Sequence, residues 1–133
     1  MLKVFPIQSK KEQQALCALC GVPFEAELLA YQATVDGEFA GICQFKLGSE
    51  GGILYHLAPP IGQQPDKEAL FVMGRAALNF IDLCGVHHAF FDGDPTVAGE
   101  KLIRAIGFTP DESGRLEMDL TDFFTTPCKH CKH

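Results

Sequence analysis

The last six residues hold the densest set of metal-ligating side chains in this sequence. Cysteine and histidine fill four of these positions, Cys128, His130, Cys131 and His133. Zinc prefers tetrahedral sets of thiolate and imidazole ligands, and a CxxC spacing lets two thiolates bind one ion. The composition of this tail therefore indicates a candidate zinc site.

A second CxxC pair, Cys17 and Cys20, lies in a segment with helical periodicity. Three interpretations stay open for it: a metal site shared with the tail, a redox pair, or two small buried hydrophobic side chains. No disulfide framework is expected, because the first residues lack the apolar run of a secretion signal and cytoplasmic thiols stay reduced. Cys43 and Cys84 have apolar neighbours and are expected in the core.

Composition indicates one globular, cytoplasmic domain. The chain has 133 residues, 47% of them hydrophobic, and contains no apolar segment of membrane-spanning length. Its formal net charge of −6 argues against nucleic acid or an acidic membrane as a partner, and it suits a cationic acceptor such as an amine. We expect the domain to cover residues 1–124 and a Cys/His-rich tail to cover residues 125–133.

Hydrophobic periodicity and turn residues predict an alternation of strands and helices. An Asp-Gly pair at 36–37 is a strong hairpin signal, and Ser9, Asp66 and Asp94 are good helix N-caps. Gly107 can adopt the left-handed conformation that ends a helix. The expected strands are 2–7, 28–35, 38–47, 53–58, 86–91 and 116–120, with a further short strand near 108–110, and the expected helices are 9–21, 66–85 and 94–107.

The element order and one short motif resemble the GNAT (N-acetyltransferase) superfamily. The order β-α-β-β-β-α-β-α-β contains a central antiparallel meander, and KLIRAIGF at 101–108 is similar to the family's aliphatic-Tyr-x-x-aliphatic-Gly-Phe helix end. The resemblance implies an α+β fold, in which a mixed, mostly antiparallel sheet is flanked by helices. It also implies acetyl-CoA as co-substrate and a small-molecule amine or peptide as acceptor. Another α+β domain with a similar order is the alternative.

In the resembling family, the pyrophosphate of acetyl-CoA binds an R/Q-x-x-G-x-G/A loop, where bare N–H groups begin a helix. Residues 59–68 do not fit this pattern. Pro65 removes an N–H donor, and Asp66 and Glu68 place negative charge where a phosphate would lie. The resemblance therefore implies a degraded phosphate loop. The remaining cofactor-binding candidates are Leu57, Ala58, Gly62, Gln63, Gln64 and Lys67.

The resemblance places catalysis at the splay between the strands predicted at 53–58 and 86–91. A backbone N–H near Leu57 or Ala58 would polarise the thioester carbonyl. Ile103 stands where many members have a tyrosine that protonates the departing thiolate, so other groups must move protons. The alternative for each histidine is a side chain that faces solvent or packs with its polar tip satisfied. The catalytic candidates are Tyr55, His56 and His87, with His88 and Asp92 nearby.

Two functions remain open. The first is acyl transfer from acetyl-CoA to an amine by a GNAT-like enzyme with an altered phosphate loop. Only residues 22–27 separate the first helix from the second strand, so the helix that usually borders the acceptor is short or missing. A second subunit, in a homodimer, could supply that wall. The second function is a non-catalytic GNAT-fold binding or metal-sensing module that uses the Cys/His tail.

Overall fold

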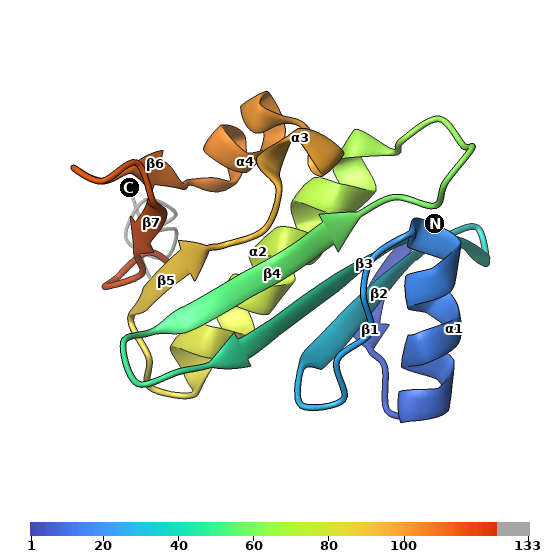
Figure 1. Cartoon of the computed structure of the whole chain (residues 1–133), viewed down its shortest axis with the longest axis horizontal. Helices are drawn as coiled ribbons and strands as arrows, with labels where there is room; N and C mark the ends of the chain where they lie inside the picture. Colours follow the sequence, from blue (N-terminus) through green and yellow to red (C-terminus); the bar gives the residue numbers. More distant parts are fainter. Residues whose placement is uncertain (125–133) are drawn as a thin grey trace, which may run out of the picture.

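The computed structural model describes residues 1–124, which form a seven-stranded sheet with helices on both faces (Figure 1). The strand order is β1-β2-β3-β4-β5-β7-β6, and each neighbouring pair is antiparallel except β4 and β5. The predicted α+β fold is therefore confirmed. The strands are β1 (Leu2–Pro6), β2 (Leu29–Val35), β3 (Glu38–Leu47), β4 (Gly52–Ala58), β5 (His88–Phe91), β6 (Thr109–Pro110) and β7 (Leu116–Asp119), and the helices are α1 (Lys10–Cys20), α2 (Lys67–Leu83), α3 (Pro95–Ala98) and α4 (Glu100–Ile106).

Local sequence signals account for the turns and helix starts of the N-terminal half. Asp36 and Gly37 adopt positive φ angles of 52° and 86° in the two-residue turn that joins β2 to β3. Positive φ at both central residues is what a twisted hairpin requires, and Asp-Gly tolerates it. Before α1, the Ser9 hydroxyl accepts a hydrogen bond from the Glu12 N–H at 3.2 Å. Both features occur where the sequence predicts them.

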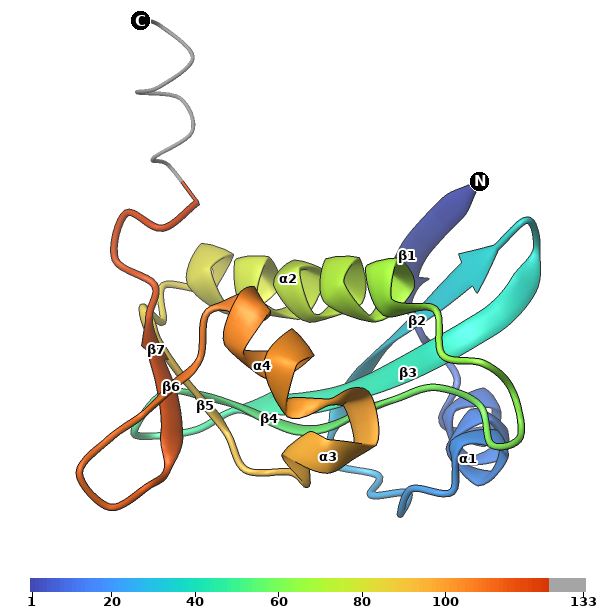
Figure 2. The same ribbon diagram turned by 90° about the horizontal axis from the view of Figure 1, so that it is seen from above.

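Hydrophobic cores lie on the two faces of the sheet (Figure 2). α2 and α4 cover one face, where Phe45, Leu70 and Phe108 are fully buried. α1 covers β2, β3 and the end of β4 on the opposite face, where Ile42 and Ala58 are buried. In Figure 2, α1 lies only under this part of the sheet. On that side no helix of residues 1–124 covers β5 and β7.

The helix predicted at 94–107 is two helices, α3 and α4. Gly99 separates them with φ 106° and ψ 128°, a conformation that a helix cannot contain and that favours glycine. Its N–H still bonds the Pro95 carbonyl and its carbonyl accepts from the Ile103 N–H, so the chain turns without losing these bonds. The short strand expected near 108–110 is confirmed as β6. None of the helices in residues 1–124 combines the length and the apolar character needed to cross a membrane.

Candidate active site

β4 and β5 separate part-way along their length. Their parallel pairing covers three residue pairs, from Gly52 with Ala89 to Leu54 with Phe91. One further backbone bond, from Asp92 N–H to the Leu54 carbonyl at 2.9 Å, closes the paired region. Beyond it, no strand of residues 1–124 pairs with β4 on the β5 side. The second half of β4 therefore has an open backbone edge.

A β-bulge at Tyr55 accompanies this divergence. Gln44 of β3 pairs with His56, and the next residue, Phe45, pairs with Leu54, so Tyr55 has no partner in β3. Such a bulge bends the strand and increases its twist. On the other side, Gly93 lies against the Tyr55 carbonyl so closely that a Cβ atom would overlap the oxygen. The bulge and the glycine together set how far the two strands diverge.

Replacing Gly93 with alanine tests this close approach. We expect Gly93→Ala to lose about 1–3 kcal/mol of unfolding free energy, because the methyl group must displace the Tyr55 backbone. The matched control is Gly48→Ala, whose Cβ would lie 3.3 Å from the nearest atom, the Gly51 carbonyl oxygen. Urea denaturation measures both variants. Equal stability of the two variants would contradict the assigned role of Gly93.

A cavity of about 310 Å³ lies at the splay. β4 contributes residues 55–58 to its wall, the chain after β5 contributes 92–94, and the chain after α1 contributes 21–23. The structure thus brings together Tyr55, His56, Leu57 and Ala58, which the resemblance implied would share one site. Asp92 and Asp94 line the same cavity, and their carboxylates favour a cationic ligand.

Two glutamines that do not stand out in the sequence hold His56 in this cavity. Gln44 Nε2 of β3 lies 2.8 Å from His56 Nδ1, and Gln13 Nε2 of α1 donates to Gln44 Oε1 at 2.8 Å. Both glutamine side chains are fully buried. The only sequence signal for them is a polar residue at a position that the apolar periodicity assigns to the core. Burial lowers the pKa of His56, and the charge of Glu25 opposes that shift.

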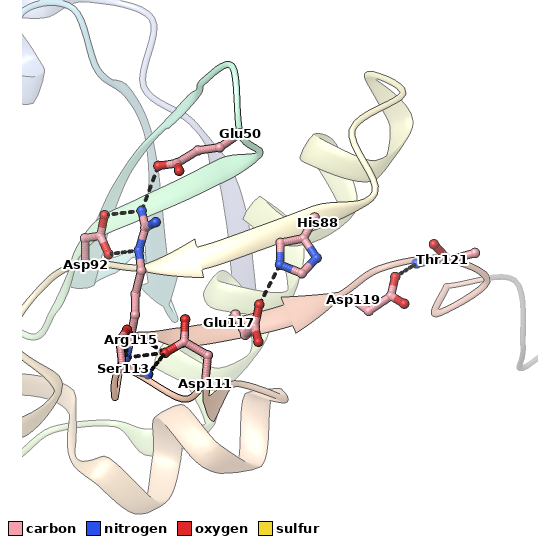
Figure 3. A network of polar contacts seen from close by, with 9 residues as sticks. All are labelled: Glu50, His88, Asp92, Asp111, Ser113, Arg115, Glu117, Asp119 and Thr121. Atoms are coloured by element: carbon pink, nitrogen blue, oxygen red, sulfur yellow. Dashed lines mark hydrogen bonds and ion pairs between the residues drawn. The ribbon is translucent and has the colours of Figure 1, made fainter.

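Arg115, on the turn that enters β7, organises the acidic groups next to the cavity (Figure 3). Its guanidinium binds Asp92 through two hydrogen bonds of 2.9 and 2.8 Å and Glu50 through a third of 2.9 Å, and it stacks 3.8 Å from the Phe90 ring centroid. These bonds raise the pKa of Arg115 and lower that of Glu50. Arg115 therefore neutralises part of the charge of Asp92 and orients its carboxylate. No sequence pattern predicts this contact.

The structure does not bring His87 to the cavity. His87 precedes β5, at the end of the strand away from the splay, and its Nδ1 lies 2.6 Å from Asp82 of α2. His88 begins β5 and bonds Glu117 of β7 at 2.9 Å (Figure 3). The pairing of β4 with β5 lies between both histidines and the splay. Their contacts match the alternative interpretation, in which a polar tip is satisfied by a neighbouring group.

The loop before α2 divides its candidate cofactor ligands between two surfaces. Asp66 accepts the Ala69 N–H at 3.0 Å, so a carboxylate occupies the start of the helix. Gln63 and Gln64 line a small pocket against the β2–β3 hairpin, and Gly62 is exposed. Lys67 instead lines a groove of about 380 Å³ between α2 and α4, together with Lys101. This groove combines two cations that the sequence places 34 positions apart.

The cysteines of the described residues are not arranged as metal ligands. No group of three or more His, Cys, Asp or Glu side chains within residues 1–124 could hold a metal ion. Cys17 and Cys20 are buried in the core under α1, where burial raises both pKa values, that of Cys20 to about 12. They are small buried hydrophobic side chains, and the zinc and redox interpretations find no support here. The tail ligands Cys128, His130, Cys131 and His133 lie outside the described residues.

One core prediction was wrong. Cys84 is exposed, because it lies at the C-cap of α2, where the helix ends and Gly85 takes a φ of 86°. Leu83, the residue before Cys84, is exposed as well, so the end of the helix lies at the surface. Cys43 is buried as predicted, in the centre of β3.

The sheet with diverging β4 and β5 strands is also found in solved structures of other proteins, which identify the fold. No protein-family model matches the sequence, and no curated protein matches it significantly. An IAA acetyltransferase from Bacillus cereus is similar in structure, with a TM-score of 0.70, 18% identity, and coverage of 90% of this chain and 100% of that one. The chain therefore has the GNAT N-acetyltransferase fold, in a divergent sequence.

Two further structures agree with this assignment. The ribosomal-protein-S18-alanine N-acetyltransferase from Escherichia coli gives a TM-score of 0.66 at 13% identity, covering 90% of this chain and 94% of that one. A GNAT family N-acetyltransferase from Escherichia coli, in complex with CoA, gives 0.67 at 17% identity, covering 91% and 82%. At these identities the likeness concerns the fold.

Proposed function

We propose that this protein transfers an acyl group from acetyl-CoA to an amine in the cavity between β4 and β5. The observation that carries the proposal is the open backbone edge of β4 beside that cavity. Backbone N–H groups without a strand partner can donate to a thioester carbonyl and stabilise the charge that develops on its oxygen. The GNAT fold of the chain, which a CoA-bound structure shares, supports the same reaction class.

The residues around the cavity suit the two substrates of this reaction. Leu57 and Ala58 would receive the thioester, which supplies the activated acyl group. Asp94, together with the part of the Asp92 charge that Arg115 leaves, would attract a cationic amine near it. In the reaction the amine nitrogen bonds to the acyl carbon and the carbon–sulfur bond breaks. The cationic amine gives up two protons: the departing thiolate takes one, and a base or water takes the other. Proximity of the two substrates would supply much of the rate enhancement.

The phosphates of acetyl-CoA would bind the groove of Lys67 and Lys101 rather than the start of α2. The Asp66 carboxylate already accepts an N–H there, and it would repel a pyrophosphate. Lys67 and Lys101 supply positive charge on a groove that borders α3, whose Val97 also lines the cavity. This arrangement would replace the helix-start loop that residues 59–68 lack.

A non-catalytic binding module is the second candidate. Two observations favour it: Asp66 occupies the start of α2, and Ile103, which stands in place of the family's tyrosine, is buried in the core. Such a module would bind a ligand in the same cavity without transferring an acyl group. Metal sensing by the Cys/His tail would belong to this candidate.

Calorimetric titration with acetyl-CoA, combined with an assay for released thiol, separates these candidates. We expect saturable binding with a Kd below about 1 mM, equivalent to roughly 4 kcal/mol, and thiol release with a panel of amines. Binding without thiol release would favour the non-catalytic module. Absence of binding at about 1 mM would overturn the acyltransferase proposal.

Neutralising either lysine of the groove should weaken this binding. We expect Lys67→Ala and Lys101→Ala each to raise the Kd for acetyl-CoA roughly fivefold, because each removes a charge-assisted bond to phosphate. The difference should shrink as salt is added, since exposed charges are screened. Lys11→Ala, on the exposed face of α1, is the matched control. If Lys11→Ala weakened binding equally, the groove would not be the phosphate site.

A further inference from the structure

The buried amides of Gln13 and Gln44 connect Lys10 to His56 by hydrogen bonds. Because Lys10 can only donate, it determines which atom donates and which accepts in each later bond. Lys10 Nζ, which can only donate, lies 3.0 Å from Gln13 Oε1. The Gln13 amide nitrogen therefore faces the other way, where it donates to the Leu28 carbonyl at 3.3 Å and to Gln44 Oε1 at 2.8 Å. Both neighbours of Gln13 thus agree on the orientation of its amide.

The same logic extends to the histidine. Gln44 Oε1 accepts from Gln13, so Gln44 Nε2 faces the Pro23 carbonyl, which can only accept, at 2.8 Å. The second proton of that nitrogen points to His56 Nδ1, also at 2.8 Å. His56 Nδ1 must therefore accept. A neutral imidazole that accepts at Nδ1 carries its proton on Nε2.

We propose that the Lys10–Gln13–Gln44 chain fixes His56 as the neutral Nε2–H tautomer, so that His56 acts in the cavity as a hydrogen-bond donor and not as a base. Gln44 is then a positioning residue, which sets the tautomer of a residue that lines the cavity. Within residues 1–124 the ring makes its hydrogen bond through Nδ1, which leaves Nε2 for a ligand. The role in acyl transfer rests on the proposed function, whereas the tautomer does not.

Both ways of converting His56 into a base are unfavourable. A proton on Nδ1 would face the Gln44 N–H group, and turning the Gln44 amide would break its bonds to Gln13 and Pro23. Each change leaves a buried donor or acceptor without a partner, which is strongly unfavourable. The charged groups around the ring are Glu25, which favours the charged form, Asp92 and Asp94 across the cavity, and Lys10 at the far end of the chain. Glu25 makes no hydrogen bond to the ring in the described residues, so it does not replace Gln44.

In the proposed reaction this tautomer assigns His56 a defined task. Its Nε2–H would donate to an oxygen or to the sulfur of a bound ligand. The neutral ring has no free lone pair for the amine proton, because Gln44 occupies the one on Nδ1. Proton removal from the acceptor must therefore involve another group or water. The cavity should also prefer amines that carry an oxygen acceptor, such as a carbonyl or carboxylate, near the reacting nitrogen.

Imidazole nitrogen NMR of isotope-labelled protein, recorded without acetyl-CoA, tests the tautomer directly. A His56→Gln variant assigns the signals. We expect the proton on Nε2 and an unprotonated Nδ1 at neutral pH. A proton on Nδ1, or a charged ring at neutral pH, would overturn the inference. Because no ligand is present, this result does not depend on whether the protein transfers acyl groups.

The substitution Gln44→Glu provides the second arm. A carboxylate at this position accepts instead of donating, so His56 should move its proton to Nδ1 and titrate at a higher pH. Gln32→Glu is the matched control, since Gln32 is also a buried glutamine in the sheet and lies outside the chain of amides. It should leave the His56 signals unchanged. An unchanged tautomer in a folded Gln44→Glu protein would overturn the role of Gln44. If that variant fails to fold, the spectrum of the unsubstituted protein still tests the tautomer of His56.

Turnover supplies a readout that structural damage alone would not produce. In Gln44→Glu, His56 should lose its Nε2–H donor. The rate of acyl transfer to an oxygen-bearing amine should then fall about tenfold, which corresponds to the loss of one hydrogen bond. The rate with an amine that lacks such an oxygen should change little. Equal losses for both amines would contradict the assigned task. Absence of turnover with every amine, beside the predicted NMR spectrum, would reject the proposed function and leave the tautomer assignment intact.

Discussion

Truncating Phe108 should destabilise the protein more than any other substitution proposed here, by about 3–5 kcal/mol. Phe108 is fully buried directly after α4, and its ring lies 5.8 Å from that of Phe91, centroid to centroid. Phe108→Ala removes the whole ring and leaves a cavity between α4 and the sheet. Because Phe91 is the last residue of β5 paired with β4, the loss should also loosen the start of the splay.

Urea or thermal denaturation measures this loss, and acetyl-CoA titration measures its effect on the site. Phe5→Ala is the matched control, because Phe5 is 38% exposed on β1, at the edge of the sheet. We expect its loss to be several times smaller. If the two variants lost the same free energy, Phe108 would not be the anchor of α4 that its burial indicates.

Alkaline pH should destabilise the fold through its buried thiols, chiefly Cys20 and Cys43 and in addition Cys17, whose pKa burial also raises. Burial raises the pKa of Cys20 and of Cys43 to about 12, from 9.0. A raised pKa in the folded state means that folding favours the protonated thiol. The resulting stability is complete below pH 9 and is lost as the pH rises towards 12. Between neutral pH and pH 10 Cys20 and Cys43 should therefore each remove about 1.4 kcal/mol, or about 3 kcal/mol together.

Denaturation in reducing buffer at a series of pH values measures this fall in the free energy of unfolding. Cys43→Ala should remove the part of this fall that Cys43 contributes, even though the substitution itself also lowers stability at every pH. Cys84→Ala is the matched control, because Cys84 is exposed. A pH dependence that Cys43→Ala leaves unchanged would show that other groups control alkaline unfolding.

The sequence predicts the elements of this fold well because their signals are local. Ser9 caps α1, Asp94 caps α3, and the Asp-Gly pair turns the β2–β3 hairpin, all within a few residues of the atoms they bond. Apolar periodicity then assigns one face of each element to the core. The exception at Gly99 depends on a backbone angle that a glycine allows but does not require.

Some of the site could also be predicted, because it follows from strand order. Residues 55–58 lie at the splay once β4 is followed by a helix and a parallel β5. His87 could not be placed in this way, since two adjacent positions at a strand end differ in the direction of their side chains and in their distance from the splay. Only its contact with Asp82 shows its surroundings.

Tertiary structure alone decides the chemistry of the cavity. Gln13, Gln44 and His56 come from α1, β3 and β4, and no local pattern relates an amide on one element to the tautomer of a ring on another. Arg115 likewise bonds Asp92 from the neighbouring strand: Arg115 precedes β7 and Asp92 follows β5. Hydrogen bonds of this kind depend on atoms within about 3 Å of each other, whereas sequence patterns report only which face of an element is buried. By itself, the sequence therefore determines the elements and their order, and packing determines what the residues of the site can donate, accept or hold.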